Sequence, residues 1–303
     1  MTNKISTIII LTACFFATNL FAQNDGAGNT GMAFLKLGVG AESMAMGEAY
    51  SSLSEDATAY VYNPARLSFG SPKNVSLMHN SSIQDLNNDF IAAKFNLGGR
   101  LTMGLGVVRS SVDNIEIRTT PGDPIGTFSA ENLSIGISMG YKLSETFSIG
   151  LTTKWLYEKI YIDDATGVGF DIGASYQKNN FSLSGTIANL GSLDDLRNVP
   201  TNLPTLVRLG GGYRFSKKDF DFRIGVEGFK VMDGGSLHLH AGGEVGYKDF
   251  LFVRAGYQSG YENKNFTTGV GFKYKGIKLD YAFIPYSSEF GTSNAFSLGI
   301  NFN

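Results

Sequence analysis

The sequence predicts an all-β protein: a transmembrane antiparallel β-barrel of about 14 strands with a short helical plug near its N-terminus. Three observations lead to this prediction. From residue 74 onward, apolar and polar residues alternate with a period of two, which is typical of strands with two different faces. The connections between these strands alternate between tight turns and longer loops. The stretch 31–67 lacks the alternation and is rich in Ala, Met and Gly.

The composition favours the same class. Of 303 residues, 43% are hydrophobic and only 17% are charged, and the chain contains 38 glycines and 23 phenylalanines. High glycine and aromatic content suits many strands and tight turns. The formal net charge is −2 without a clustered run of basic residues, so nucleic acid is not an expected partner.

Residues 1–22 are expected to be a secretory signal peptide. Lys4 supplies the positive start, apolar residues follow, and Ala22 is the expected cleavage position before Gln23. A transmembrane helix is the first alternative, but the apolar run is short and interrupted by polar residues. Lipidation of Cys14 is the second, and the apolar residues that follow it argue against it. Cleavage after Ala22 would remove Cys14, the only cysteine.

Residues 23–73 are expected to form a polar linker and then a plug inside the barrel. Two runs of helical spacing predict two short helices, and Asn63 should end the second because it precedes a proline. Asp56 is placed to cap that helix near Ala57. The candidate plug motif comprises residues suited to close backbone approach, capping or turns: Gly38, Gly40, Gly47, Asp56, Asn63, Pro64 and Ala65. A candidate apolar pocket between plug and wall comprises Phe34, Leu35, Met44, Met46 and Tyr60.

Residues 74–303 are expected to form the barrel. The predicted strands are 74–78, 89–96, 101–109, 129–141, 147–160, 167–177, 181–189, 206–215, 220–230, 237–247, 250–258, 265–274, 277–284 and 295–301. One face of these strands is apolar, with aromatic residues near the strand ends, and the other carries glycines and charges such as Lys154, Arg208, Arg223 and Glu244. This pattern predicts that the apolar face, including Leu151, contacts lipid and that the polar face lines the lumen.

The connections are expected to place tight turns at one end of the barrel. Tight turns are predicted at 98–99, 143–145, 178–180, 216–218, 248–249 and 275–276, and longer connections at 110–128, 191–205, 259–264 and 285–294. In outer-membrane barrels the tight turns face the periplasm and the longer loops lie outside. The chain also ends in alternating apolar residues, which resembles the terminal strand of barrels inserted by the outer-membrane assembly machinery.

An ordered series of motifs in the plug segment identifies a family. The series is Gly31-x-x-Phe34-Leu35-x-Leu37-Gly38-Val39-Gly40-Ala41, then Ala45-Met46-Gly47-Glu48-Ala49, then Asp56-Ala57-Thr58-Ala59 and Tyr62-Asn63-Pro64-Ala65. It resembles the N-terminal segment of the PorV/PorQ family of outer-membrane barrels, within the wider FadL-like class.

The resemblance implies an integral protein of the outer membrane of a Gram-negative bacterium, in contact with outer-membrane lipid. It also implies a non-enzymatic part in type IX secretion, with the translocon, attachment-complex or cargo proteins as partners. Both the PorV role, which is to pass cargo to the attachment machinery, and the PorQ role stay open. The alternative is a FadL-like channel for hydrophobic small molecules, and a purely structural barrel is the third possibility.

The chain offers no arrangement that calls for an enzyme or a cofactor. Serine, histidine and aspartate residues occur without a nucleophile elbow. His238, His240 and Glu244 share one predicted lumen face, where a metal site is conceivable. Polar lining of the lumen is the preferred interpretation, so catalytic, cofactor-binding and metal-binding residues are all expected to be absent.

Overall fold

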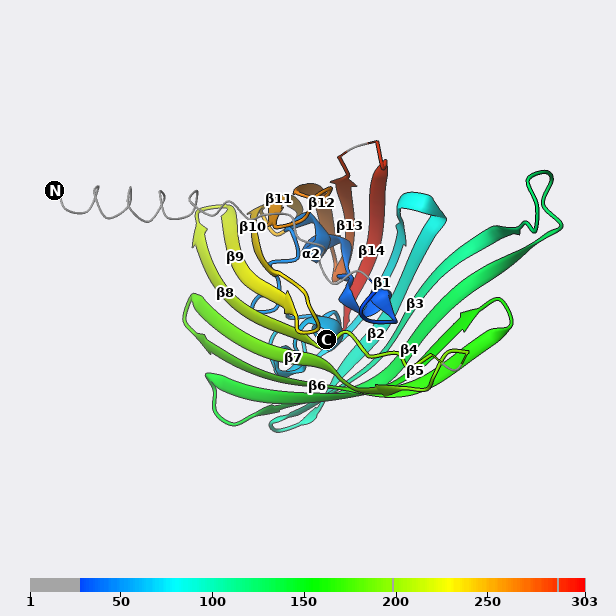
Figure 1. Cartoon of the computed structure of the whole chain (residues 1–303). Coiled ribbons are helices and arrows are strands. Elements are labelled where there is room, and N and C mark those ends of the chain that lie inside the picture. Colours follow the sequence, from blue (N-terminus) through cyan, green and yellow to red (C-terminus); the bar gives the residue numbers. More distant parts are fainter. Residues whose placement is uncertain (1–27, 198, 288, 303) are drawn as a thin grey trace.

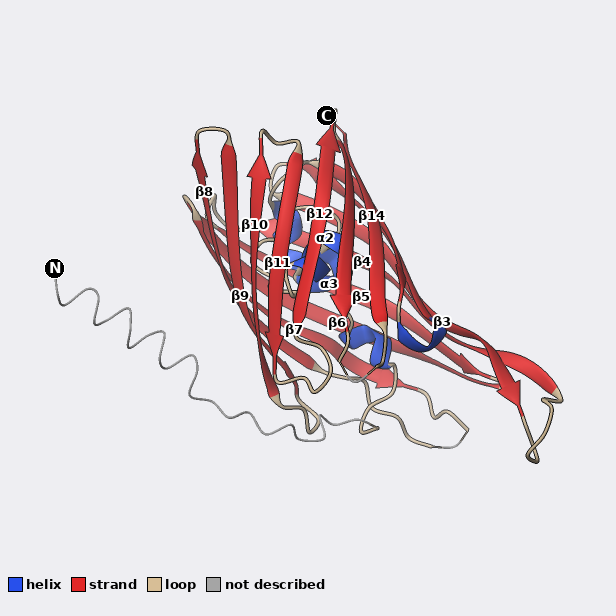
Figure 2. Cartoon of the chain, turned by 90° about the horizontal axis from the view of Figure 1, so that it is seen from above, coloured by secondary structure: helices blue, strands red, loops and turns tan. Residues whose placement is uncertain are grey.

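The computed structural model describes residues 28–197, 199–287 and 289–302, and these residues form a closed antiparallel barrel (Figures 1 and 2). The expected signal peptide, its cleavage position and Cys14 lie outside the described residues. The fourteen strands are β1 Lys73–Ser81, β2 Leu86–Gly98, β3 Leu101–Ile117, β4 Gly126–Lys142, β5 Phe147–Ile160, β6 Asp163–Lys178, β7 Phe181–Leu193, β8 Leu206–Lys217, β9 Phe220–Val231, β10 Leu237–Tyr247, β11 Leu251–Ser259, β12 Phe266–Tyr274, β13 Ile277–Pro285 and β14 Thr292–Phe302.

Each strand pairs with its neighbours in sequence, and β1 pairs with β14 to close the sheet. The prediction of a barrel of about 14 strands is therefore confirmed. The short helices are η1 Ala33–Lys36, α2 Ala41–Ala45, α3 Ala59–Tyr62, η2 Pro64–Ser68 and η3 Ile83–Asp85. Among the described residues, no helix has both the length and the apolar character needed to cross a bilayer.

The apolar face of the wall points outward and the polar face points inward, as the alternation of the sequence predicted. On β5, Leu151 and Trp155 point outward and are 48% and 45% exposed, whereas Thr152 between them is completely buried. The charged residues Lys154 and Arg208 are also buried, on the lumen side. The apolar face of the barrel therefore contacts lipid, and the polar face lines the lumen.

The connections differ from the predicted pattern in two places. β3 and β4 continue as paired strands to Ile117 and Gly126, past a register shift between Val112 and Ile115, so most of the expected loop 110–128 is strand. The β3–β4 hairpin therefore projects well beyond the wall (Figure 2). At the same end, β5 and β6 are joined by only two residues, 161–162. The tight turns β8–β9 and β10–β11 lie at the end where β14 finishes (Figure 2).

The segment before β1 lies inside the barrel and supplies much of its core. α2 packs against β11 to β14, and η2 packs against β3 to β6 on the other side of the lumen. The principal apolar cluster joins plug residues such as Met46 and Tyr62 to wall residues such as Phe90 and Ile284. The plug is thus packed against the wall rather than suspended in an open lumen (Figure 2).

Glycines on the lumen face allow the plug backbone to approach the strands. A Cβ atom on Gly256 would lie 2.1 Å from the backbone nitrogen of Gly47, and one on Gly242 would lie 2.1 Å from the backbone oxygen of Met46. On the opposite wall, a Cβ on Gly150 would lie 2.3 Å from the backbone nitrogen of Ala65. Side chains at these three positions would displace the plug.

Candidate functional site: the plug and its contacts with the wall

The three motif glycines lie where the plug backbone turns or touches other groups. Gly40 (φ 86°) directly precedes α2, and Gly47 (φ 62°) follows it, in a backbone region that disfavours other residues. A Cβ on Gly47 would meet the backbone nitrogen of Tyr257 at 2.9 Å. Gly38 has no such backbone angle, but a Cβ there would lie 2.5 Å from the Tyr62 hydroxyl. These glycines therefore allow the plug backbone to lie close to β11 at Gly47 and close to the α3 residue Tyr62 at Gly38.

The Asn63-Pro64-Ala65 turn connects the plug to β6. Asn63 ends α3 and begins η2, and its Oδ1 accepts a hydrogen bond of 2.9 Å from the backbone N–H of Ala65. Its Nδ2 donates to the backbone oxygen of Ala174 in the wall at 3.1 Å. Pro64 occupies the first position of η2, where its missing N–H costs nothing. One amide side chain thus stabilises the turn and attaches it to the barrel.

Asp56 organises the start of α3, although the helix begins at Ala59 rather than near Ala57. Its Oδ1 accepts hydrogen bonds from the backbone N–H of Thr58, at 3.0 Å, and from the Thr58 hydroxyl. The backbone N–H of Ala57 donates to Oδ1 of Asn74 in β1 at 2.8 Å. Burial, together with the nearby Glu42 carboxylate, raises the pKa of the Asp56 carboxyl.

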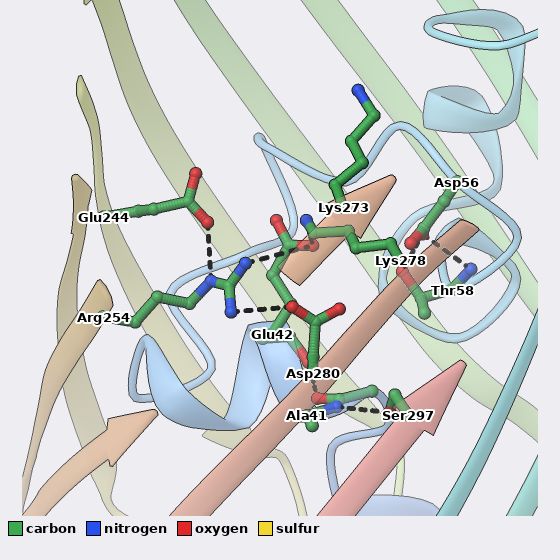
Figure 3. Close-up of polar contacts among 12 residues, drawn as sticks. Ala41, Glu42, Asp56, Thr58, Glu244, Arg254, Lys273, Lys278, Asp280 and Ser297 are labelled. Atoms are coloured by element: carbon green, nitrogen blue, oxygen red, sulfur yellow. Dashed lines mark hydrogen bonds and ion pairs between the residues drawn. The ribbon is translucent and has the colours of Figure 1, made fainter. Parts of the chain in front are cut away.

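A cluster of ion pairs fixes α2 to β9, β10, β11 and β13, and Figure 3 shows part of it. We call it the Glu42 cluster; its members are Glu42, Arg223, Glu244, Arg254, Lys278 and Asp280. Glu42 accepts hydrogen bonds from Arg223 and from Lys278. Arg254 donates to Glu244 at 2.6 Å and pairs with Asp280 at 2.8 Å. Burial raises the pKa of the Glu42 carboxyl, but Arg223, Lys278 and Arg254 outweigh burial and hold that pKa well below its ordinary value.

Two further plug carboxylates form ion pairs elsewhere. Glu48, which is 5% exposed, accepts a hydrogen bond of 2.8 Å from Lys264 in the β11–β12 loop. Glu55 pairs with Arg214 of β8 at 2.5 Å and with Arg66 of η2 at 3.3 Å. The plug is therefore held by charged groups at three separate places on the wall.

The lumen-face residues Arg208, Arg223 and Glu244 contact the plug in different ways, and Arg208 lies over the ring of the plug residue Tyr62 at 5.3 Å. Arg223 contacts Glu42 directly, and Glu244 acts through Arg223, to which it is bound at 2.6 Å. Arg208 donates to Glu227 at 2.8 Å, and the other oxygen of Glu227 accepts from the backbone N–H of Ser51 at 2.9 Å.

The plug carboxylates that make these contacts were missed in the sequence. Glu42, Glu48 and Glu55 stand in a stretch rich in Ala, Met and Gly that was expected to lie inside a barrel. Charges buried in such a place need partners of opposite sign. That requirement, together with the cations on the predicted lumen face, could have identified these carboxylates as residues that hold the plug.

The five candidate pocket residues do not line one cavity. Phe34 and Leu35 pack with Leu156 and Leu203, whereas Met44, Met46 and Tyr60 belong to the principal apolar cluster. The cavity that Phe34, Leu35 and Tyr60 share is about 20 Å³ and is also lined by charged residues of β5, β6 and β8. Pockets for small ligands are usually larger by more than tenfold.

A larger lumenal cavity of about 380 Å³ lies between the plug and β1, β2 and β9–β14. Most of its lining residues are polar, and they include Glu42, Asp56, Arg223 and Lys278. Its border also includes Asp249 in the tight turn between β10 and β11. We call this cavity the vestibule, and it lies toward the tight-turn end of the barrel.

The residues weighed for a metal site make other contacts. The His238 ring stacks on Tyr261, with ring centroids 4.0 Å apart, and His240 Nε2 lies 3.1 Å from the Tyr261 hydroxyl. Glu244 belongs to the Glu42 cluster. Within the part of the chain that the structure describes, no three His, Cys, Asp or Glu residues are grouped as metal ligands.

Comparisons with known proteins identify a sequence family and a fold. The sequence model of one family, described as type IX secretion system protein PorV, matches residues 21–231. No curated protein sequence matches the chain.

Among solved structures, the P. putida toluene transporter TodX shares 15% identity, with 88% of this chain and 99% of TodX covered and a TM-score of 0.65. The CymD monoaromatic hydrocarbon channel shares 13% identity, with 88% and 98% covered and a TM-score of 0.64. At these identities the likenesses show the barrel fold.

Proposed function

We propose a function from one premise: this chain belongs to the PorV family of type IX secretion system proteins. The barrel, its outward apolar face and its relatives make it an outer-membrane protein. We propose that it is a non-enzymatic component of type IX secretion that binds or shuttles cargo proteins. Its partners would be cargo, the translocon or the attachment complex.

A plug fixed inside the closed sheet is the observation that carries this proposal. The plug is pinned by buried ion pairs at Glu42 and Glu48 and by a half-buried pair at Glu55, and the sheet around it is closed. Removing one partner of a buried ion pair typically costs about 3–5 kcal/mol, so a plug held at three places should stay in position under ordinary conditions. A barrel closed in this way is suited to work through its surfaces and loops, as a secretion component does.

The proposal includes the processing and organisation of the chain. The mature protein would begin near Gln23 after removal of residues 1–22, and 23–73 would be the linker and plug. Residues 74–303 would form the integral barrel in the outer membrane of a Gram-negative bacterium. β1 begins at Lys73, next to this proposed boundary.

Deletion of the gene tests the function. In cells that lack the protein, type IX cargo should accumulate in the periplasm and disappear from the surface and medium, and a plasmid copy should restore it. Uptake of fatty acids and of toluene should be unchanged. Normal cargo release together with lost uptake would overturn the proposal and favour a channel.

Passive uptake of hydrophobic small molecules is the second candidate function. It is favoured by the fold shared with proteins described as a toluene transporter and a monoaromatic hydrocarbon channel. Such a channel needs an apolar path between plug and wall, and the cavity beside Phe34 and Tyr60 measures about 20 Å³. If this function is correct, Phe34→Ala and Tyr60→Ala should change uptake and leave cargo secretion untouched.

A further inference from the structure

The outer wall of the barrel carries an apolar groove of about 710 Å³ along the seam between β14 and β1. Its lining comes from seven consecutive strands, β12 to β14 and β1 to β4. Most of the lining side chains point outward; Ile91, Phe272 and Leu279 are 48%, 48% and 56% exposed. Because the outward face contacts the bilayer, this hollow opens into lipid.

A row of polar side chains crosses one end of the groove. We call it the polar belt; it consists of His79, Asp89, Arg109 and Glu131 on β1, β2, β3 and β4. His79 Nδ1 lies 2.7 Å from Asp89 Oδ1, and Arg109 Nε donates to Glu131 at 2.6 Å. His79, Asp89 and Arg109 line the groove itself. All four side chains are between 38% and 57% exposed.

The polar belt lies at the level of the membrane interface. His79 faces Phe296 across the β1–β14 pair, and the Phe296 ring packs against Tyr281 with centroids 4.9 Å apart. Aromatic residues at this depth are typical of the interfacial girdles of outer-membrane barrels. β1 ends at Ser81, two residues beyond His79, so the belt lies near the end opposite the tight turns. That end is the outer face, where a charge costs only about 0–1 kcal/mol.

Beyond the belt the outward-facing lining of the groove is apolar and runs toward the tight-turn end, whereas Asp280 and Ser297 in its lining contact Arg254 and the plug residue Ala41 on the lumen side. Leu77 and Leu298 form its floor beside the seam, and Leu279 and Phe272 continue it on β13 and β12. Among the outward-facing side chains, polarity therefore changes once along the groove, from charged at the interface to apolar within the membrane. A lipid molecule has the same order of polar and apolar parts.

We propose that this groove holds one diacyl lipid whose chains lie on the floor formed by Leu77 and Leu298 and whose phosphorylated headgroup contacts Arg109. Arg109 uses Nε for Glu131, while its Nη1 lies 3.7 Å from Asp89, which leaves N–H groups of the guanidinium for a phosphate oxygen. A guanidinium is well suited to phosphate because its donors match the geometry of the oxygens. The chains fill a hollow that would otherwise leave its apolar lining without contacts.

Native mass spectrometry of the full chain tests the proposal. The protein would be inserted into vesicles that contain phosphatidylglycerol, extracted in mild detergent, and examined for retained lipid. Wild type should keep one phosphatidylglycerol. Leu77→Trp, which fills the floor, should lose it, whereas Ile137→Trp, at a more exposed outward position on β4 outside the groove, should retain it. Heat-modifiable gel mobility checks that each variant is folded.

A second comparison tests the headgroup contact. Loss of one charge-assisted hydrogen bond should weaken binding about tenfold. Arg109→Ala should therefore bind phosphatidylglycerol about tenfold more weakly than wild type. Diacylglycerol, which lacks the phosphate, should bind wild type and Arg109→Ala equally. No retained lipid in wild type, or equal retention by Leu77→Trp, would overturn the proposal. So would a co-purifying membrane protein that Leu77→Trp displaces while the lipid count stays unchanged, because the groove would then be a protein interface.

Discussion

Neutralising Glu48 should loosen the plug measurably, because this carboxylate is buried and paired with a loop cation. Burial raises the pKa of the Glu48 carboxyl, but Lys264 and other nearby cations lower it from 4.5 to about 2. One pKa unit corresponds to about 1.4 kcal/mol, so the charged form gains about 3 kcal/mol from folding at neutral pH. We expect Glu48→Gln to reduce the free energy of unfolding by about that amount, since it also leaves Lys264 without its partner.

The effect has a defined pH dependence. The pKa of Glu48 is lower in the folded protein than in the unfolded chain, so its contribution is fully present above pH 4.5 and is lost as the pH falls toward 2. The difference in stability between wild type and Glu48→Gln should therefore be constant near neutral pH and should shrink across that acidic range. Reversible urea unfolding in lipid vesicles, followed by heat-modifiable gel mobility, measures the difference.

Two controls isolate the buried pair. Asp249→Asn breaks the exposed pair between Asp249 and Lys273 at 2.7 Å and should cost less than about 1 kcal/mol. Glu48→Gln combined with Lys264→Met should recover part of the loss, because no charge is then left buried without a partner. If Glu48→Gln is as stable as wild type at pH 7, or if its deficit does not change with pH, the assignment of Glu48 as an anchor is wrong.

Three further predictions concern the membrane face, the plug and the N-terminus. Leu151→Arg places a charge in lipid and should cost about 2–4 kcal/mol, seen as reduced outer-membrane yield, whereas Leu143→Arg in a tight turn should insert normally; equal yields would reverse the assigned faces. Deletion of residues 31–67 should give a barrel that conducts ions in a planar bilayer while full-length protein conducts little, and a highly conducting wild type would contradict a sealed lumen. Mass spectrometry of the mature protein should find an N-terminus near Gln23, and an acylated Cys14 would exclude the proposed signal cleavage.

The strand pattern was predictable because each strand has a lipid face and a lumen face. Apolar residues on the first face alternate with polar residues on the second along the sequence. Leu151 was assigned to the correct side from the sequence alone. The length of the β3–β4 hairpin was not predictable, because residues beyond the membrane no longer need the alternation of apolar and polar faces. The pairing of Ile115 with Phe128 keeps the hairpin extended past its neighbours.

The space inside the barrel was harder to predict than its wall. Thr152 faces the lumen, but it is completely buried and its hydroxyl lies 2.6 Å from that of Ser138, so a large side chain there would be overpacked rather than solvated. The members of the candidate pocket were equally hard to group from the sequence. Phe34 and Met46 were grouped by hydrophobicity, yet they lie in different clusters because the plug chain turns between them. Sequence periodicity reports the faces of an element, not which elements meet.

The plug contacts also indicate the order in which the barrel is completed. Gly47 donates a hydrogen bond of 3.0 Å to the Thr267 hydroxyl, 220 residues later, and Glu42 binds Lys278 of β13. Contacts between residues so far apart form late because the loop between them must close first. The plug is synthesised before the wall, but Glu42 and Glu48 have their partners only after β9 to β13 exist. Placing Glu42 in an incomplete lumen would bury a charge without compensation. The plug should therefore dock last, when the strands that carry Arg223, Arg254 and Lys278 have assembled around it.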